Sequence, residues 1–159
     1  MYKLLFICLL LINAAQAQNR WYVPSKKELL TYPCFAISGV AKGYHDAAVL
    51  HYWKRGNSWI DPKISFQRKY KDFANGDMRP AYFGSKTFLV WTTDFSHLTE
   101  AVSITSFGAG VALNFADIKN ELKLYKKSQR IPIILVRKIL YPIVVRSLAF
   151  ELIFKNLKS

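Results

Sequence analysis

Cysteine is scarce in this sequence, and its scarcity excludes a large class of exported proteins. The 159 residues contain only Cys8 and Cys34, and Cys8 lies within an N-terminal apolar run. If that run is removed, the one remaining thiol cannot form an intramolecular bridge, so the chain is not a disulfide-stabilised secreted scaffold. The sequence also lacks a nucleophile elbow, a phosphate-binding glycine loop and a paired-cysteine metal signature. No common catalytic or zinc motif is therefore present.

Acidic residues are also few. Ten Asp and Glu stand against 23 Lys and Arg, which gives a net charge of +13, while 52% of the residues are hydrophobic and 15% aromatic. A strongly basic chain suits nucleic acid or anionic lipid as a partner, and the high apolar content favours lipid. We therefore expect anionic membrane lipid as a partner and no nucleic acid, and a protein partner stays open.

The N-terminus has the pattern of a secretory signal peptide. Lys3 precedes an apolar run from Leu4 to Ile12, and Ala15-Gln16-Ala17 provides a small-x-small cleavage site. The run is shorter than the roughly 20 apolar residues that cross a bilayer. No small residue directly precedes Cys8, which argues against lipid attachment there. We predict a signal peptide over residues 1–17 and a single domain over residues 18–159.

The first part of that domain predicts one helix. Asn19 to Pro33 is expected to be irregular because it is polar and contains two prolines. From Phe35 to about Trp53 the pattern is helical, and small residues recur every four positions on one face, at Gly39, Gly43 and Ala47, followed by His51. This spacing favours close packing of a second helix. The alternative is a pair of tolerated glycines in an amphipathic helix.

The segment from Lys54 to Pro80 is basic and aromatic. Turns are expected at Gly56-Asn57, Asp61-Pro62 and Gly76-Asp77. Between the last two, apolar, aromatic and cationic residues alternate, which suits a membrane interface, where rings lie at headgroup depth and cations meet phosphates. We expect an extracytoplasmic loop lying on the membrane; an ordinary solvated loop is the alternative.

Two segments are candidate membrane spans. Residues 95–115 are apolar and rich in small residues, as in packed transmembrane helices, although a buried helix of a soluble protein stays open. Residues 139–154 form a shorter candidate, or an interfacial amphipathic helix. Just before this second segment, Arg137 and Lys138 are expected to reach toward the cytoplasmic surface, and within it Arg146 needs an internal partner.

The basic stretch from Asp117 to Arg130 follows the first candidate span. By the positive-inside rule it is expected on the cytoplasmic side, if residues 95–115 cross the membrane. A signal peptide places the mature N-terminus on the other side. We therefore predict an inner-membrane protein with its mature N-terminus outside the cytoplasm.

The best candidate for chemistry is the polar stretch before the first span. On a helix, Asp94 and His97 share a face, and Glu100 follows one turn later. A carboxylate and an imidazole can bind a divalent metal or act as an acid–base pair, and His51 can complete a metal site if the two helices pack through their glycines. The alternatives are helix capping by Thr93 or Asp94 within a polar network. No cofactor is strongly implied.

Three pieces of the sequence carry a resemblance to a known family. AISGVAKGYHDAAVLHY, WIDPKISFQRKYK and FGSKTFLVWTTDFSHL resemble the core of a family of small uncharacterised bacterial membrane proteins, over about Ala36 to Leu98. The chain departs from the family pattern at Phe66, Arg68 and Lys86, among other positions. The resemblance implies a membrane location and a shared fold, and no reaction.

We therefore predict a mostly α-helical, membrane-associated protein with one or two membrane-embedded helices and a basic-aromatic extracytoplasmic loop. The expected role is a non-enzymatic interaction or scaffolding module in the bacterial inner membrane. Two alternatives are a membrane-interface, metal-dependent hydrolase that uses Asp94 and His97, and a secreted soluble lipid-binding protein.

Overall fold

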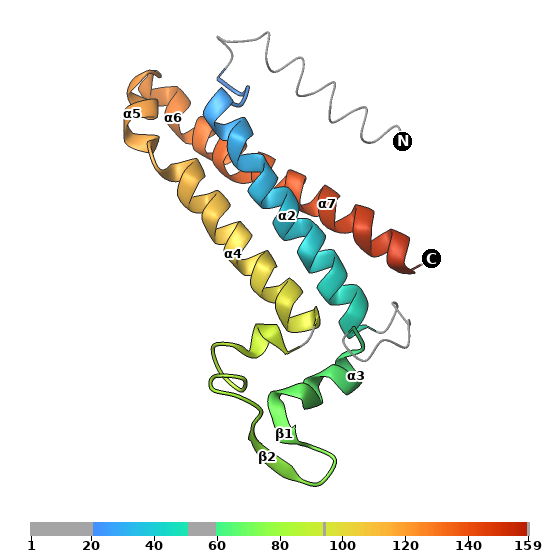
Figure 1. Cartoon of the computed structure of the whole chain (residues 1–159). Coiled ribbons are helices and arrows are strands. Elements are labelled where there is room, and N and C mark those ends of the chain that lie inside the picture. Colours follow the sequence, from blue (N-terminus) through green and yellow to red (C-terminus); the bar gives the residue numbers. More distant parts are fainter. Residues whose placement is uncertain (1–20, 51–59, 94, 159) are drawn as a thin grey trace.

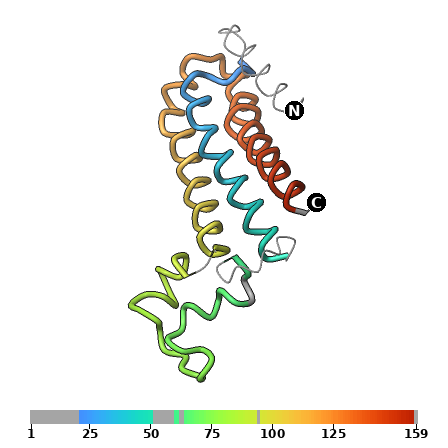
Figure 2. The backbone as a smooth tube through the Cα atoms, turned by 45° about the vertical axis from the view of Figure 1, so that its right-hand side comes forward, coloured from blue at the N-terminus to red at the C-terminus, as the bar shows by residue number. Residues whose placement is uncertain are grey.

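The computed structural model describes residues 21–50, 60–93 and 95–158, and over these the chain is mostly helical. Three long helical arms lie side by side, and a small module with a two-stranded hairpin lies at one end of them (Figure 1). Figure 2 shows α2 between α4 and the arm that ends in α7. The elements in chain order are α2 (Lys26–Val49), α3 (Pro62–Ser65), η1 (Phe66–Lys69), β1 (Tyr70–Asp72), β2 (Asp77–Pro80), η2 (Val90–Thr92), α4 (Phe95–Phe115), α5 (Ile118–Lys123), α6 (Lys127–Ile133), η3 (Ile134–Leu140) and α7 (Tyr141–Lys158).

Helix α2 begins much earlier than its prolines suggest. Ser25 and Glu28 form a capping box, in which each side chain accepts a hydrogen bond from the other residue's backbone N–H. Pro33 lies inside the helix with its ring exposed, away from the neighbouring helices. The expectation of an irregular segment up to Pro33 was therefore wrong for residues 26–33, because the cap at Ser25 starts a helix that tolerates the proline on its outer face.

The small residues of α2 do allow close packing, but against α7. A Cβ atom added at Gly39 would lie 2.1 Å from the Arg146 carbonyl oxygen, and one at Gly43 would lie 3.0 Å from that of Phe150. The predicted close approach is confirmed, since the backbones are in near contact at both glycines. Its partner differs from the one that the proposed metal site needed, because the glycine stripe faces α7 and not α4.

Helix α4 coincides with the predicted segment 95–115. Together with α5 it is, among the described residues, the one helical stretch long and apolar enough to cross a membrane, and only 17% of its most apolar window is buried. At 1.5 Å per residue its 21 residues extend about 32 Å, close to the roughly 30 Å of a bilayer core. The second predicted segment, 139–154, is helical as well, in η3 and α7, and does not meet that apolar criterion.

The third arm contains a π-helix, η3, just before Pro142. Proline has no N–H to donate to the carbonyl of Lys138, four residues earlier. Asn114 of α4 supplies the missing donor, since its Nδ2 donates to the Lys138 carbonyl oxygen at 3.1 Å. The Tyr141 N–H reaches back five residues to the carbonyl of Val136, which is the π pattern. The proline and a side chain from another helix therefore account for the irregular turn.

The module at the end of the arms where α2 ends and α4 begins is built around the hairpin of β1 and β2 (Figure 1). Tyr70 pairs with Pro80 and Asp72 with Asp77, in antiparallel register. Gly76 closes the turn with a φ of 77°, a left-handed conformation that favours glycine, so the turn expected at Gly76-Asp77 is confirmed. Ser85 is fully buried and donates to the Lys69 carbonyl oxygen at 2.9 Å, which ties the following loop to the hairpin.

Candidate functional site

The interior of the helical arms is unusually polar. Among the described residues of the arms, nine polar or charged side chains are buried, against six hydrophobic ones. Large hydrophobic side chains instead lie on the outside, and they are exposed along every long arm. Examples are Leu30, Ile37, Ile104, Phe107, Leu113, Leu135, Ile143, Leu148 and Leu152. This distribution is the reverse of that in an ordinary water-soluble bundle.

The most highly charged part of this interior is an ionic cluster of Glu28, Glu121, Arg137 and Lys138. Arg137 is 1% exposed. Its Nε donates to Glu28 at 2.9 Å, and its Nη2 donates to both Glu28 and, at 2.6 Å, Glu121. Its Nη1 donates to the Tyr125 hydroxyl at 2.9 Å. The guanidinium therefore connects α2, α5 and η3, and each of its three nitrogens has an acceptor.

Lys138 completes the same cluster. Its Nζ lies 2.8 Å from Glu28 Oε1 and 2.6 Å from Glu121 Oε2. It also donates to the Asn114 carbonyl oxygen at 3.0 Å. An ammonium group has three protons, and Lys138 has three oxygen neighbours. Because a π-helix has more residues per turn, successive side chains are separated by a smaller angle, which helps Arg137 and Lys138 to point inward together.

The chemistry of this cluster is that of a closed structural network. Two carboxylates and two cations balance in charge, and each cation forms an ion pair with each carboxylate. A general acid or base needs a proton that can reach a substrate, and the nearly complete burial of Glu28, Arg137 and Lys138 removes that access. The cluster therefore fixes three elements to one another at one end of the arms.

Sequence reasoning missed this cluster and misplaced two of its members. Arg137 and Lys138 were expected to extend to a membrane surface, and the structure places both inside, because Glu28 and Glu121 provide counter-charges there. The capping pattern Ser25-x-x-Glu28 was a signal that could have marked the helix start. It could not have shown that Glu28 also meets residues more than 100 positions away.

A second polar layer lies midway along the arms. Ser38 of α2 and Ser103 of α4 exchange hydrogen bonds, each hydroxyl donating to the other residue's carbonyl oxygen, at 2.8 and 3.0 Å. Arg146 of α7 donates from Nε to the Ser38 hydroxyl at 3.1 Å, and its guanidinium lies 5.3 Å from the centre of the Phe107 ring. The internal partner that Arg146 was expected to need is confirmed.

The predicted metal or acid–base set falls largely outside the described residues. His51 and Asp94 lie there, so their arrangement with His97 is not defined. His97 is half-buried in the first turn of α4. Within residues 21–50, 60–93 and 95–158, no group of three or more His, Cys, Asp or Glu side chains could hold a metal ion. Asp94 and His97 therefore stay candidates by sequence alone, and Glu100 is exposed on α4.

The other polar pair on α2 has a structural role. Asp46 forms an ion pair with Lys42, one turn earlier on the same helix. His45 Nδ1 lies 2.9 Å from the Ser96 carbonyl oxygen at the start of α4. Since Lys27 forms an ion pair with Asp117 at the other end of α4, α2 and α4 lie antiparallel along their whole lengths.

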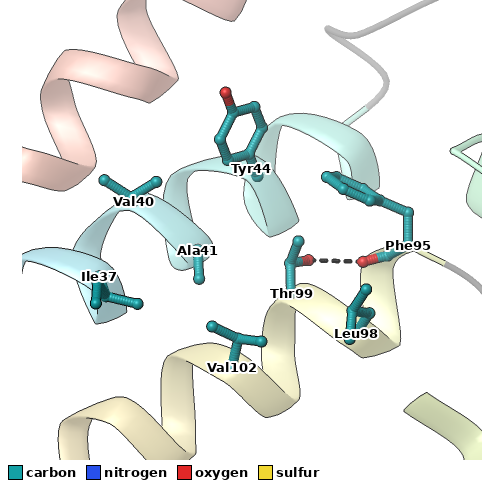
Figure 3. Close-up of a pocket in the computed structure, with 8 residues that line it drawn as sticks. All are labelled: Ile37, Val40, Ala41, Tyr44, Phe95, Leu98, Thr99 and Val102. Carbon is teal, nitrogen blue, oxygen red and sulfur yellow. Dashed lines mark hydrogen bonds between the residues drawn. The ribbon is translucent and has the colours of Figure 1, made fainter. Parts of the chain in front are cut away.

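An apolar groove lies between α2 and α4, near the hairpin end (Figure 3). Its volume is about 380 Å³. It is lined by Ile37, Val40, Ala41, Tyr44, Phe95, Leu98, Thr99 and Val102. Ala41 and Thr99 are its most buried members, so the groove exists because two small side chains face each other there.

The hairpin end exposes cations and aromatic rings together. Phe83 is 86% exposed and Phe88 62%, and the two rings pack edge to face. Lys69 and Lys86 both lie over the Tyr70 ring, at 5.4 and 5.2 Å from its centre. This surface, which we call the hairpin surface (residues 64–91), matches the composition expected at a membrane interface.

One ion pair of the hairpin is well defined electrostatically. The Arg79 guanidinium donates two hydrogen bonds to Asp77, at 2.9 and 2.7 Å. These bonds, with a further one from the Arg79 backbone N–H, lower the pKa of Asp77 from 3.8 to about 2. Asp77 is therefore ionised at neutral pH and paired with Arg79, and among the described residues neither Lys69 nor Lys86 forms an ion pair with a carboxylate.

Comparison with known proteins gave no match. No family model, no curated protein and no solved structure matches this chain. The resemblance to a family of small bacterial membrane proteins therefore stays a prediction.

Proposed function

We propose that this protein is a non-enzymatic interaction or scaffolding module of the bacterial inner membrane. In this proposal the signal peptide is removed after Ala17, and all three helical arms are embedded in the bilayer, including α2, which the sequence did not predict as a membrane-embedded helix. Their apolar outer faces contact lipid, and the hairpin surface lies at one membrane surface, where it contacts anionic lipid.

The reversed distribution of polar and apolar side chains carries the proposal. In water, exposing so many large side chains would cost about 25 cal/mol per Å² of apolar surface. In a bilayer those same faces are solvated by lipid, and polar groups turn inward to satisfy one another. The inward-facing layers at Ser38 and at Arg137, and the outward-facing Ile104 and Leu148, follow this second pattern.

The burial of the ionic cluster, whose charges pair with one another, supports a non-enzymatic role. The cluster is the largest group of buried ionisable side chains among the described residues, and its charges are used to join helices. A rigid bundle with apolar outer faces is suited to holding other membrane components in place. A catalytic centre would need an ionisable group that a substrate can reach.

The antiparallel packing of α2 and α4 constrains the topology. The first turn of α2 and the basic α5–α6 segment lie at the same end of the arms, joined by the Lys27–Asp117 pair. In the proposed spanning bundle they lie on the same side of the membrane, whereas the sequence cues placed them on opposite sides. We keep the mature N-terminus outside, as the signal peptide predicts. The proposal then puts the basic α5–α6 segment outside and the hairpin surface on the cytoplasmic side, and it differs from the expected placement of both segments.

Membrane fractionation tests this proposal. Cells that express the protein are lysed, and their membranes are washed with alkaline carbonate. The intact mass of the protein in the membrane pellet is then measured. We expect the chain to stay in the pellet with the mass of residues 18–159. Release into the wash would contradict embedded arms and would favour a peripheral or secreted lipid-binding protein, and a retained full-length mass would contradict cleavage after Ala17.

A further inference from the structure

The apolar groove between α2 and α4 has the shape of a site for one extended chain. Figure 3 shows Ile37 and Val102 toward one end, Tyr44 and Phe95 toward the other, and Ala41 and Thr99 between them. Ile37 to Tyr44 covers two helical turns, about 10 Å. The volume of 380 Å³ lies at the lower end of the usual range for small-molecule sites, about 300–1,000 Å³.

The lining of the groove favours hydrocarbon over a polar ligand. Seven of the eight side chains present carbon surface, in part from two aromatic rings. The hydroxyl of Thr99 is used within its own helix, where it lies 2.9 Å from the Phe95 carbonyl oxygen and 3.0 Å from that of Ser96. A polar ligand would lose its hydrogen bonds to water and gain few in return.

The hairpin module adjoins the Phe95 end of the groove and carries more cations than carboxylates over residues 64–91, which favours an anionic headgroup there. Phe95 is the first residue of α4, and η2 of the hairpin module packs against this end of the helix. Lys69 and Lys86 belong to that module, and Asp77 is already neutralised by Arg79. Cations beside a membrane surface attract lipid phosphates.

From these observations we propose that the groove between α2 and α4 binds one acyl chain of an anionic phospholipid, whose phosphate lies at the hairpin surface near Lys69 and Lys86. This inference rests on the proposed membrane location, and it names one specific lipid partner of the module. A neutral phospholipid and a helix from a second copy of the chain are the competing occupants, and the experiment below separates them.

Photolabelling of the purified protein in detergent tests the inference. The probe is a phosphatidylglycerol with a diazirine in one acyl chain, added at one equivalent per protein, and the labelled peptides are mapped by mass spectrometry. We expect labels concentrated in residues 37–44 and 95–102. Val102→Trp fills the groove and should reduce this labelling at least tenfold. Ile104→Trp, an equally large change on the exposed face of the same helix, should leave it unchanged.

The outcomes that overturn the inference are distinct. Labels spread equally over the outer faces of α4 and α7 would show that the groove does not select a chain. A protein that is dimeric in detergent and does not take up the probe would assign the groove to a second copy. The distribution of labels in the wild-type protein decides between these outcomes even if Val102→Trp does not fold.

The headgroup is tested with the matching phosphatidylcholine probe. Each cation near a membrane surface contributes about fivefold to anionic lipid binding, so at least fivefold stronger labelling is expected from phosphatidylglycerol, and Lys69→Gln with Lys86→Gln should remove the difference. Equal labelling by both probes in the wild type would overturn the headgroup assignment. Release by carbonate together with selective labelling would instead contradict the membrane-embedded proposal, while the assignment of the groove to an anionic lipid would still hold.

Discussion

Glu28→Gln is expected to destabilise the protein by about 3–5 kcal/mol. The substitution keeps the shape of the side chain and removes its charge, which leaves Arg137 and Lys138 buried with only Glu121 as a counter-charge. Loss of one member of a buried ion pair has this order of effect, because an uncompensated charge stays in a poorly solvated site. The measurement is thermal unfolding in detergent, monitored by circular dichroism.

Two variants control this experiment. Glu151→Gln makes the same chemical change at an exposed pair with Lys155, for which about 0.5 kcal/mol or less is expected. Glu28→Gln combined with Lys138→Met restores neutrality inside the cluster, so the double variant should lose less stability than the two single changes added together. If Glu28→Gln and Glu151→Gln had equal effects, the cluster would not fix the helices to one another.

Gly39→Ala should separate α2 from α7. The added Cβ would lie 2.1 Å from the Arg146 carbonyl oxygen and 3.0 Å from the Ala149 Cβ. A backbone atom cannot move aside as the end of a flexible side chain can, so the helices must shift. We expect a loss of at least about 1–3 kcal/mol, the usual cost of overpacking, measured by the same thermal unfolding.

Gly108→Ala is the matched control for this prediction. Gly108 also lies within a helix, but a Cβ added there meets nothing within 4 Å. Alanine has the better helix propensity, by about 1 kcal/mol, so this variant should be as stable as the wild type or more so. A similar loss of stability in both variants would show that the close contact between α2 and α7 is not the reason that position 39 requires glycine.

Features that depend on local sequence were predictable. The apolar segment 95–115 lies between Asp94 and Asp117, and α4 has the same limits as the predicted segment. The four-residue spacing of Gly39 and Gly43 indicated a close helix contact, because only the absence of a side chain lets backbones approach so nearly. The Lys42–Asp46 pair followed from its spacing on one helix.

Features that depend on distant contacts were not. The inward direction of Arg137 and Lys138 requires Glu28 and Glu121, and the π-helix requires both Pro142 and the side chain of Asn114. The partner of the glycine stripe also could not be read from α2 alone. The candidate site at Asp94, His97 and His51 was predicted from spacing, and two of its three members lie outside the described residues.

The most direct test of the central claim is the environment of the outer faces of the arms. Spin labels are placed one at a time at Ile104→Cys and Leu148→Cys, with Cys8 and Cys34 changed to alanine, and the protein is reconstituted in phospholipid nanodiscs. Ala74→Cys, in the exposed hairpin turn, is the control. If the arms are embedded, the first two labels will be readily reached by oxygen and poorly by a water-soluble nickel complex, with the reverse at residue 74. Ready access of the nickel complex to all three positions would contradict the account.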